Sequence, residues 1–414
     1  DLFKANYEQY LKYGVVGIIS QEGGFTSHAS IVASEYGITC VVGYTKSIKQ
    51  EFLELDATSE SIKLDSGRES DCKLVAFSKS KRGSFSTLDM SLYNESDPSI
   101  VWLQEISGND YLRIVGGKAL KLGILYNKGN SAITVPNGFV VTTKHFYSYL
   151  MSNNIINRQG IFNEKLKDVG SIQYAIIHGK ISKEMSDNIF TFFDDLQGLS
   201  GGSSLLVAVR SSATQEDAEH SSFAGQFSSY LFQSRKHIID SIKRCWASAF
   251  TEKVMDYMKK QHIDYDQINM AVLIIEMIEA DKSGVIFTDI PTKKQHHAFI
   301  IEAIKGVAEP LVSGKIRPNY FELDQKGKLI NKKRRVQHWA QGITRNEFLM
   351  MYHPMDFFKN VISSEEYILV DQEFGDLFVV AKDIENIFGI PQDIEWAIKD
   401  NVIYLLQSRP LTRK

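Results

Sequence analysis

The sequence predicts an α/β protein made of two unequal parts. Short runs rich in Val and Ile alternate with longer helix-like stretches, and a polar segment separates a small first part from a larger second one. Alternating strands and helices of this kind are typical of α/β folds. We therefore expect an α/β domain over residues 1–77, a linker over residues 78–108 and a second, larger unit over residues 109–414.

The first part has the order strand, turn, helix, strand. Thr26 or Ser27 suits a helix N-cap, and Gly37 stands where helices commonly end on a glycine. This order favours an α/β domain that ends near residue 75. The expected elements are a strand at Val15–Ser20, a turn at Gly23-Gly24, a helix at Thr26–Tyr36 and a strand at Ile38–Val42.

A polar segment and a longer series of elements follow. Residues 78–108 are rich in Ser, Lys, Asp and Asn and are broken by Gly and Pro, which is typical of a linker. Apolar runs beyond it predict strands at Leu205–Arg210, Val272–Met277, Gly284–Thr288, Ala298–Ala303 and Val402–Gln407. Between them we expect helices at Ser182–Leu196 and Ile238–Lys259.

Composition excludes several classes of protein. The 414 residues have a net charge of −3 and a pI near 6.4, so no domain-wide basic surface indicates nucleic acid or an anionic membrane as a partner. No run of about 18 apolar residues predicts a membrane span. Cys40, Cys72 and Cys245 form no CxxC pair, which favours a reducing cytoplasm. The chain begins on Asp1 without Met and reaches a strand at once, so we expect a fragment of something longer.

One histidine, His28, is placed where the Gly-Gly loop becomes a helix. A helix N-terminus combines unpaired N–H groups with about half a positive charge, so it favours an anion. A phosphoryl group on His28 would be stabilised there, and glycines on the strand side let a partner domain approach closely. An exposed histidine on an ordinary capped helix is the alternative.

Two cationic residues of the second unit suit phosphate binding. Lys118 follows the glycine pair of Ile114–Ala119, although a solvated lysine fits that pattern as well. Arg210 ends an expected buried strand and runs into Ser211 and Ser212, where its fork of donors is suited to phosphate oxygens. Pairing with a structural carboxylate is the other interpretation of this arginine.

Two later stretches suggest a base pocket and a metal site. Asp281–Thr288 enters a strand that either walls an apolar adenine pocket or belongs to the core. Glu395 and Gln407 flank the turn-like Lys399-Asp400-Asn401, and adjacent antiparallel strands would bring both oxygens to one magnesium, with Arg409 close by. A surface hairpin with a solvated glutamate is the alternative.

Together these motifs resemble a known family. The stretch GGFTSHASIVASEYGITCVVG is similar to the swivelling phosphohistidine domain of the phosphoenolpyruvate-utilising enzymes. Five further stretches resemble the ATP-grasp (α+β) nucleotide-binding domain shared by pyruvate phosphate dikinase, phosphoenolpyruvate synthase and rifampin phosphotransferase. They are IVGGKALKLGIL with VPNGFVVTT, VAVRSSATQEDAEHSSFAGQF, KSGVIFT and DIEWAIKDNVIYLLQSRPLT.

The resemblance implies ATP and Mg²⁺ as cofactors and a role for each motif residue. The β-phosphoryl group of ATP would pass to His28, the γ-phosphoryl group to water or phosphate, and AMP would be released. The polar linker would be the hinge for the swing of the phosphohistidine to its acceptor. The implied roles are phosphate binding for Lys118 and Arg210, magnesium binding for Glu395 and Gln407, charge stabilisation for Arg409, and a nucleotide contact for Glu309.

Several features depart from the family pattern. Ser34, Thr39 and Ile275 replace a frequent Arg, Pro and Gln, and the histidine domain precedes the ATP-grasp domain, as in the plant glucan water dikinases. The first strand of the histidine domain is expected before Asp1. The acceptor is expected to be a small molecule bound by an upstream domain or another chain; the oligomeric state stays open. A polysaccharide dikinase and a non-catalytic nucleotide-sensing module are the alternatives.

Overall fold

The computed structural model describes most of the second unit and four strands of the first. The described residues are 17–20, 39–42, 53–56, 61–64, 86–129, 132–166, 168–201, 204–216, 227–260, 263–289, 298–312, 317–333 and 367–411. His28 and the helix expected at Thr26–Tyr36 lie outside these ranges. The role of this histidine therefore stays a prediction.

The four described strands near the N-terminus form two pairs. Strand β1 (Gly17–Ser20) pairs in parallel with β2 (Thr39–Val42), so both expected strands are confirmed. A parallel pair is not joined by a tight hairpin. Strands β3 (Leu53–Asp56) and β4 (Ser61–Leu64) pair in antiparallel fashion.

A five-stranded antiparallel sheet lies at the centre of the larger part of the described chain. Its order is β5-β6-β9-β7-β8. The strands are β5 (Ile100–Trp102), β6 (Gly138–Val141), β9 (Met270–Glu276), β7 (Val207–Ala213) and β8 (Ser229–Gln233). The central strand β9 has an unbroken apolar run because both its faces are buried: Val272 and Ile274 pack in one core, Leu273 and Ile275 in another.

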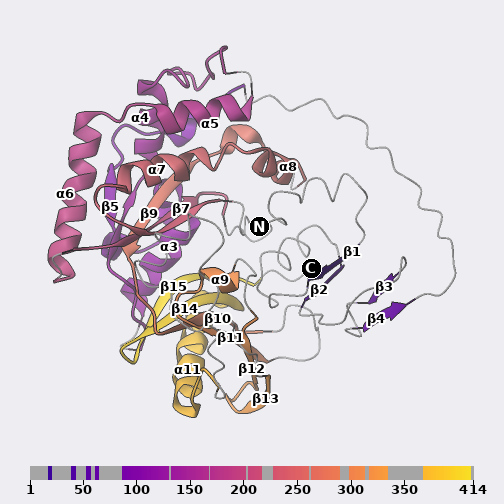
Figure 1. Cartoon of the computed structure of the whole chain (residues 1–414). Coiled ribbons are helices and arrows are strands. Elements are labelled where there is room, and N and C mark those ends of the chain that lie inside the picture. The colour runs from indigo at the N-terminus through magenta and orange to yellow at the C-terminus, as the bar shows by residue number, and fades with distance from the viewer. Residues whose placement is uncertain are drawn as a thin grey trace, which may run out of the picture.

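Helices cover one face of this sheet (Figure 1). They are α4 (Thr143–Ser152), α5 (Val169–His178), α6 (Lys183–Leu199), α7 (Ile238–Ala247) and α8 (Glu252–Lys260). The single helix expected at Ile238–Lys259 is therefore wrong. The Ser248 hydroxyl donates to the carbonyl of Cys245, the buried Phe250 turns into the core, and the Thr251 hydroxyl accepts from the N–H of Val254 and restarts the helix.

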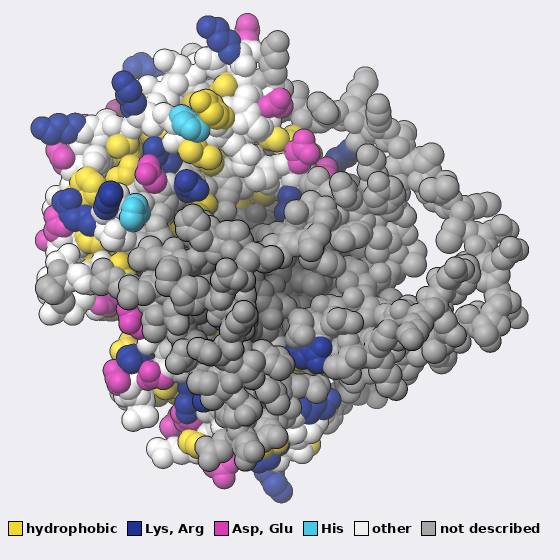
Figure 2. Space-filling model, viewed as in Figure 1, with side chains coloured by type: hydrophobic (Ala, Val, Ile, Leu, Met, Phe, Trp, Pro, Cys, Tyr) yellow, Lys and Arg dark blue, Asp and Glu magenta, His cyan; other side chains and the backbone are white. Residues whose placement is uncertain are grey.

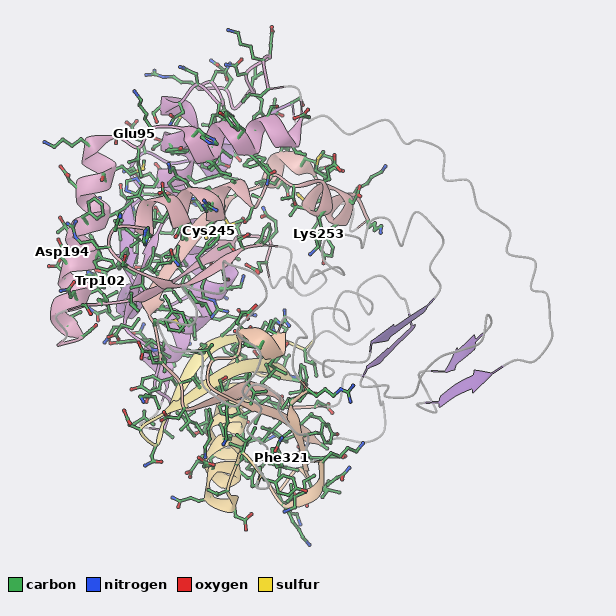
Figure 3. All side chains as sticks on the ribbon, in the orientation of Figure 1. Glu95, Trp102, Asp194, Cys245, Lys253 and Phe321 are labelled. Atoms are coloured by element: carbon green, nitrogen blue, oxygen red, sulfur yellow. The ribbon has the colours of Figure 1, made fainter. Side chains whose placement is uncertain are left out.

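A six-stranded antiparallel sheet forms the second half, in the order β13-β12-β11-β10-β14-β15. Its strands are β10 (Lys282–Phe287), β11 (Phe299–Lys305), β12 (Asn319–Leu323), β13 (Leu329–Lys333), β14 (Gln392–Lys399) and β15 (Val402–Pro410). Helix α11 (Asp371–Phe388) packs on one face, and the one-turn helix α9 (Glu309–Val312) follows β11. In Figure 3, Cys245 marks the core beneath the helices and Phe321 the core against α11.

Helix α3 (Leu112–Lys128) contacts both sheets, with β7 and β9 on one side and β15 on the other. Its backbone leaves helical geometry at Gly116, where φ is 73° and ψ is 171°. Only glycine adopts this combination readily, and an added Cβ would overlap the carbonyl oxygen of Ser212. The kink thus lets α3 lie directly against β7.

Part of the predicted linker is wrong. Strand β5 pairs with β6, and the short 3₁₀ helices η1 (Met90–Leu92), η2 (Leu103–Glu105) and η3 (Asn109–Tyr111) surround it. Leu88, Leu103 and Ile106 are almost fully buried. Polar composition suggested a linker, but these few apolar side chains suffice to hold residues 86–108 against the five-stranded sheet. A fourth 3₁₀ helix, η4 (Tyr265–Gln267), precedes β9.

The described surface mixes both signs of charge. On the face of the molecule that Figure 2 shows, the described Lys and Arg side chains are interspersed with Asp and Glu, as a net charge of −3 leads one to expect. Within the described ranges, no helix is both long enough and apolar enough to cross a bilayer.

Candidate functional site

A cavity of about 280 Å³ lies between the two sheets. Its lining comes from β7, β8 and the end of β9 on one side, and from β14, β15 and the segment around α9 on the other. The six predicted site residues that the structure describes all line it: Lys118, Arg210, Glu309, Glu395, Gln407 and Arg409. Residues nearly 300 positions apart in the sequence are thus brought to one site.

Arg210 reaches this cavity because strands alternate their faces. Val209 points into the helix-covered core, so Arg210 projects from the opposite face of β7. The prediction that Arg210 ends its strand is wrong: β7 continues through Ala213, because residues 211–213 pair with β9. The guanidinium donates from Nη1 to the carbonyl of Leu406 (2.6 Å).

Glu395 and Gln407 face each other across β14 and β15, as predicted. A two-residue turn joins the strands, and its Asp400 and Asn401 have φ angles of 51° and 63°, as type I′ hairpin turns require. Burial alone would raise the pKa of Glu395, but the charges of Arg210, Arg409 and Lys118 hold it below the ordinary value. Glu395 is therefore ionised at neutral pH.

The oxygens of Glu395 and Gln407 converge on a single point. Nη2 of Arg210 donates to Glu395 Oε2 and to Gln407 Oε1, at 2.8 Å in each case. Both oxygens can thus hold one positively charged group at the same time. A carboxylate oxygen and an amide oxygen are also the hard ligands that Mg²⁺ prefers. The two residues therefore fit the ion, provided that Nη2 of Arg210 moves out of the position between their oxygens.

The remaining coordination positions must come from elsewhere. Among the residues that the structure describes, no group of three or more His, Cys, Asp or Glu side chains is arranged to hold a metal. Mg²⁺ usually completes its shell with water and substrate phosphates when the protein supplies one or two ligands. The pair Glu395 and Gln407 is thus suited to a metal that arrives with a phosphate ligand.

Lys118 enters the cavity from α3 just after the Gly116 kink. Its Nζ donates to the carbonyl of Ser211 (3.1 Å) and forms an ion pair with Glu216. The Ser212 hydroxyl accepts from the N–H of Ala119 (3.1 Å), which fixes the restarted helix on β7. Lys118 thus lies in the first turn of the restarted helix and contributes to the cavity lining.

Arg409 and Glu309 complete the charged lining. Arg409 donates from Nε to Asp393 Oδ2 (2.8 Å), and its Nη2 lies 2.6 Å from the same oxygen. Asp393 lies two residues before Glu395 on β14, so both carboxylates project from the same face. Glu309 begins α9 and lines the cavity.

The apolar part of the lining suits a flat, aromatic group. It includes Ala208, Leu231, Ile275, Met277, Val307 and Leu406. The stretch expected to wall an adenine pocket, Asp281–Thr288, contributes only Ser283 to the lining, whereas Val285, Ile286 and Phe287 are buried in core clusters. For that stretch the core-strand interpretation is the correct one.

Two acidic residues of the site were not singled out from the sequence. Glu216 follows the VRSSAT motif by two residues, and Asp393 precedes Glu395 by two. Spacing by two along a strand would have indicated Asp393. Glu216 lies in a turn beyond β7, where no periodic pattern applies, and only its burial reveals it.

Comparison with known proteins assigns both parts of the chain to known families. Residues 112–414 match the family described as pyruvate phosphate dikinase, AMP/ATP-binding domain. Residues 4–68 match the mobile domain of PEP-utilising enzymes. The chain belongs to the pyruvate phosphate dikinase family, with the mobile domain placed before the nucleotide-binding one.

Curated relatives resemble the chain at moderate identity. A probable phosphoenolpyruvate synthase of Methanocaldococcus jannaschii is 29% identical over 76% of this chain and 26% of its own length. One of Archaeoglobus fulgidus is 31% identical over 76% of this chain and 41% of its own. Rifampicin phosphotransferase of Bacillus cereus is 31% identical over 73% of this chain and 34% of its own. The chain thus spans less than half the length of these relatives.

Proposed function

We propose that the chain is an ATP-dependent phosphotransferase of the dikinase type, with His28 as the phosphoryl carrier. The observation that supports this most strongly is the meeting of Lys118, Arg210, Glu395 and Arg409 in one cavity between two sheets. His28 falls within the residues that match the mobile domain of PEP-utilising enzymes. The combination suits a reaction in which one domain charges a carrier on another.

The proposed reaction has two halves. In the first, a P–N bond forms between His28 and the β-phosphoryl group of ATP, the γ-phosphoryl group passes to water or phosphate, and AMP leaves. In the second, the phosphoryl group passes from His28 to a small acceptor. The names of the relatives suggest a pyruvate-like acid or another small organic molecule as that acceptor. We place its binding site on an upstream domain or another chain.

The charged residues of the cavity would stabilise the negative charge of the bound phosphates. Lys118, Arg210 and Arg409 supply fixed positive charge where phosphate oxygens collect negative charge during transfer. Glu395 and Gln407 would hold Mg²⁺, which when bound neutralises phosphate charge. Arg210 then turns from these two oxygens toward the phosphates, and Glu309 contributes a nucleotide contact from α9. The apolar lining receives the base.

Product analysis tests this proposal. The purified chain is incubated with ATP, Mg²⁺ and candidate acceptors, and nucleotides are separated by chromatography. We expect AMP as the nucleotide product in the wild type and none in His28→Ala. Formation of ADP alone would contradict dikinase chemistry, and ATP binding without any turnover would favour a nucleotide-sensing module instead.

A further inference from the structure

The ammonium group of Lys118 is held on two sides. Its Nζ donates to the backbone carbonyl of Ser211 at 3.1 Å and pairs with a carboxylate oxygen of Glu216. The two side chains are 10% and 4% exposed, and both residues line the cavity. Because a lysine ammonium has three N–H donors, this arrangement leaves one for a ligand in the cavity.

Glu216 itself is fixed by the turn that follows β7. Its N–H donates to the carbonyl of Ala213 (3.2 Å), and its Oε2 accepts from the N–H of Ala213 (3.4 Å). A carboxylate that lines a phosphate site repels the ligand unless it stabilises a cation that the ligand needs. Glu216 pairs with such a cation, the ammonium group of Lys118.

We propose that Glu216 is a positioning residue for Lys118, one that fixes the ammonium group of this buried lysine and directs its third N–H toward the phosphates of ATP. The inference deepens the proposed function, since it rests on the cavity being the ATP site. Glu216 does not touch the nucleotide in this account; it acts through the lysine.

The charges around Lys118 make this support necessary. Arg210 on β7 and Arg409 on β15 line the same cavity and disfavour a further positive charge. Glu395 on β14 interacts favourably with Lys118, but it also serves Arg210. On α7, burial raises the pKa of the Cys245 thiol, so this neighbour is uncharged. Without Glu216, the ammonium group would keep the carbonyl of Ser211 but lose its ion-pair partner, and among the described residues Glu395 is already shared with Arg210.

The substitution Glu216→Gln keeps the size of the side chain and removes its charge. We expect the ammonium group of Lys118 to lose its fixed position, because the ion pair that holds it is gone. The affinity for ATP should then drop about tenfold, which is the effect of losing one well-placed charge-assisted hydrogen bond.

Two measurements test the proposal. Competitive acetylation of the whole chain, with peptide mass spectrometry, reports how accessible the amine of Lys118 is without any nucleotide, and Glu216→Gln should react faster than the wild type. Calorimetric titration with a non-hydrolysable ATP analogue reports affinity. Glu216→Asp keeps the charge at a shorter reach, so it should regain part of the affinity that Glu216→Gln loses.

Glu373→Gln is the matched control. Glu373 pairs with Lys282 at 2.6 Å on the other side of β10, so its loss removes a comparable ion pair outside the cavity lining. This control should leave the acetylation of Lys118 and the affinity for the analogue unchanged. If Glu216→Gln, shown to be folded by its melting curve, acetylates at Lys118 at the wild-type rate or binds the analogue with wild-type affinity, the inference is overturned. If the wild type fails to bind the analogue, the proposed function fails, while acetylation still decides the role of Glu216.

Discussion

Arg210→Met tests whether this arginine takes the place of a cation between Glu395 and Gln407. The guanidinium lies 2.8 Å from both oxygens, and the paired side chains of Arg210 and Glu395 are only 11% and 18% exposed. Methionine has a similar length but no charge, so the variant leaves Glu395 without its closest partner.

The expected cost follows from this burial. Removing one partner of a buried ion pair costs about 3–5 kcal/mol. Arg409 and Lys118 still interact with Glu395, so we expect the lower end, about 3 kcal/mol of unfolding free energy. The double variant Arg210→Met/Glu395→Gln should recover most of this loss, because it removes the unpaired charge as well.

Urea unfolding followed by tryptophan fluorescence measures these differences, since Trp246 and Trp396 are buried in the two cores. Manganese without nucleotide should stabilise Arg210→Met, by about 2.7 kcal/mol at a hundredfold excess over its dissociation constant. It should have little effect on the wild type, in which Arg210 occupies the position. Equal stabilisation of both proteins, or a variant as stable as the wild type, would refute the reasoning.

Two further substitutions test the geometry of the helix kink and the charge state of a buried histidine. Gly116→Ala should lower stability by about 2 kcal/mol or more and weaken ATP binding, because of the positive φ and the overlap of the new Cβ with Ser212. The control is Gly375→Ala within α11, where an added Cβ meets open space. Thermal melting should show this control to be as stable as the wild type or more stable. Burial, and then the charge of Lys144, lowers the pKa of His145 to about 4, so the unfolded chain binds more protons between pH 6.5 and 4. Stability should fall by about 1.4 kcal/mol per pH unit across that window as pH decreases, and His145→Gln should flatten the slope; an unchanged slope would show that His145 is not responsible.

Much of the nucleotide-binding half was predictable from local pattern. Strands such as β9 and the hairpin of Glu395 and Gln407 follow from apolar runs and a turn sequence, and the structure places them as expected. The positions of Glu395 and Gln407 on that hairpin could also be predicted from the local sequence. Their convergence on Arg210 could not, because the pairing of β7 with β9 and the packing of the two sheets are long-range properties.

The misses have physical causes of the same kind. The expected linker is polar in composition, but a few apolar side chains, such as Leu103 and Ile106, pack it onto the sheet. The break between α7 and α8 arises from the hydroxyl groups of Ser248 and Thr251, which compete for backbone hydrogen bonds. Glu216 could not be found because its partner, Lys118, lies 98 residues away in the chain.

Transfer of label from ATP to His28 is the most direct test of the central claim. The chain is incubated in parallel with ATP labelled at the β- or the γ-phosphorus, and protein-bound label is measured after separation from nucleotide. We predict acid-labile label from the β position, absent in His28→Ala and retained in His178→Ala, which removes an exposed histidine on α5. Retained label from the γ position, or β label that persists in His28→Ala, would contradict the account.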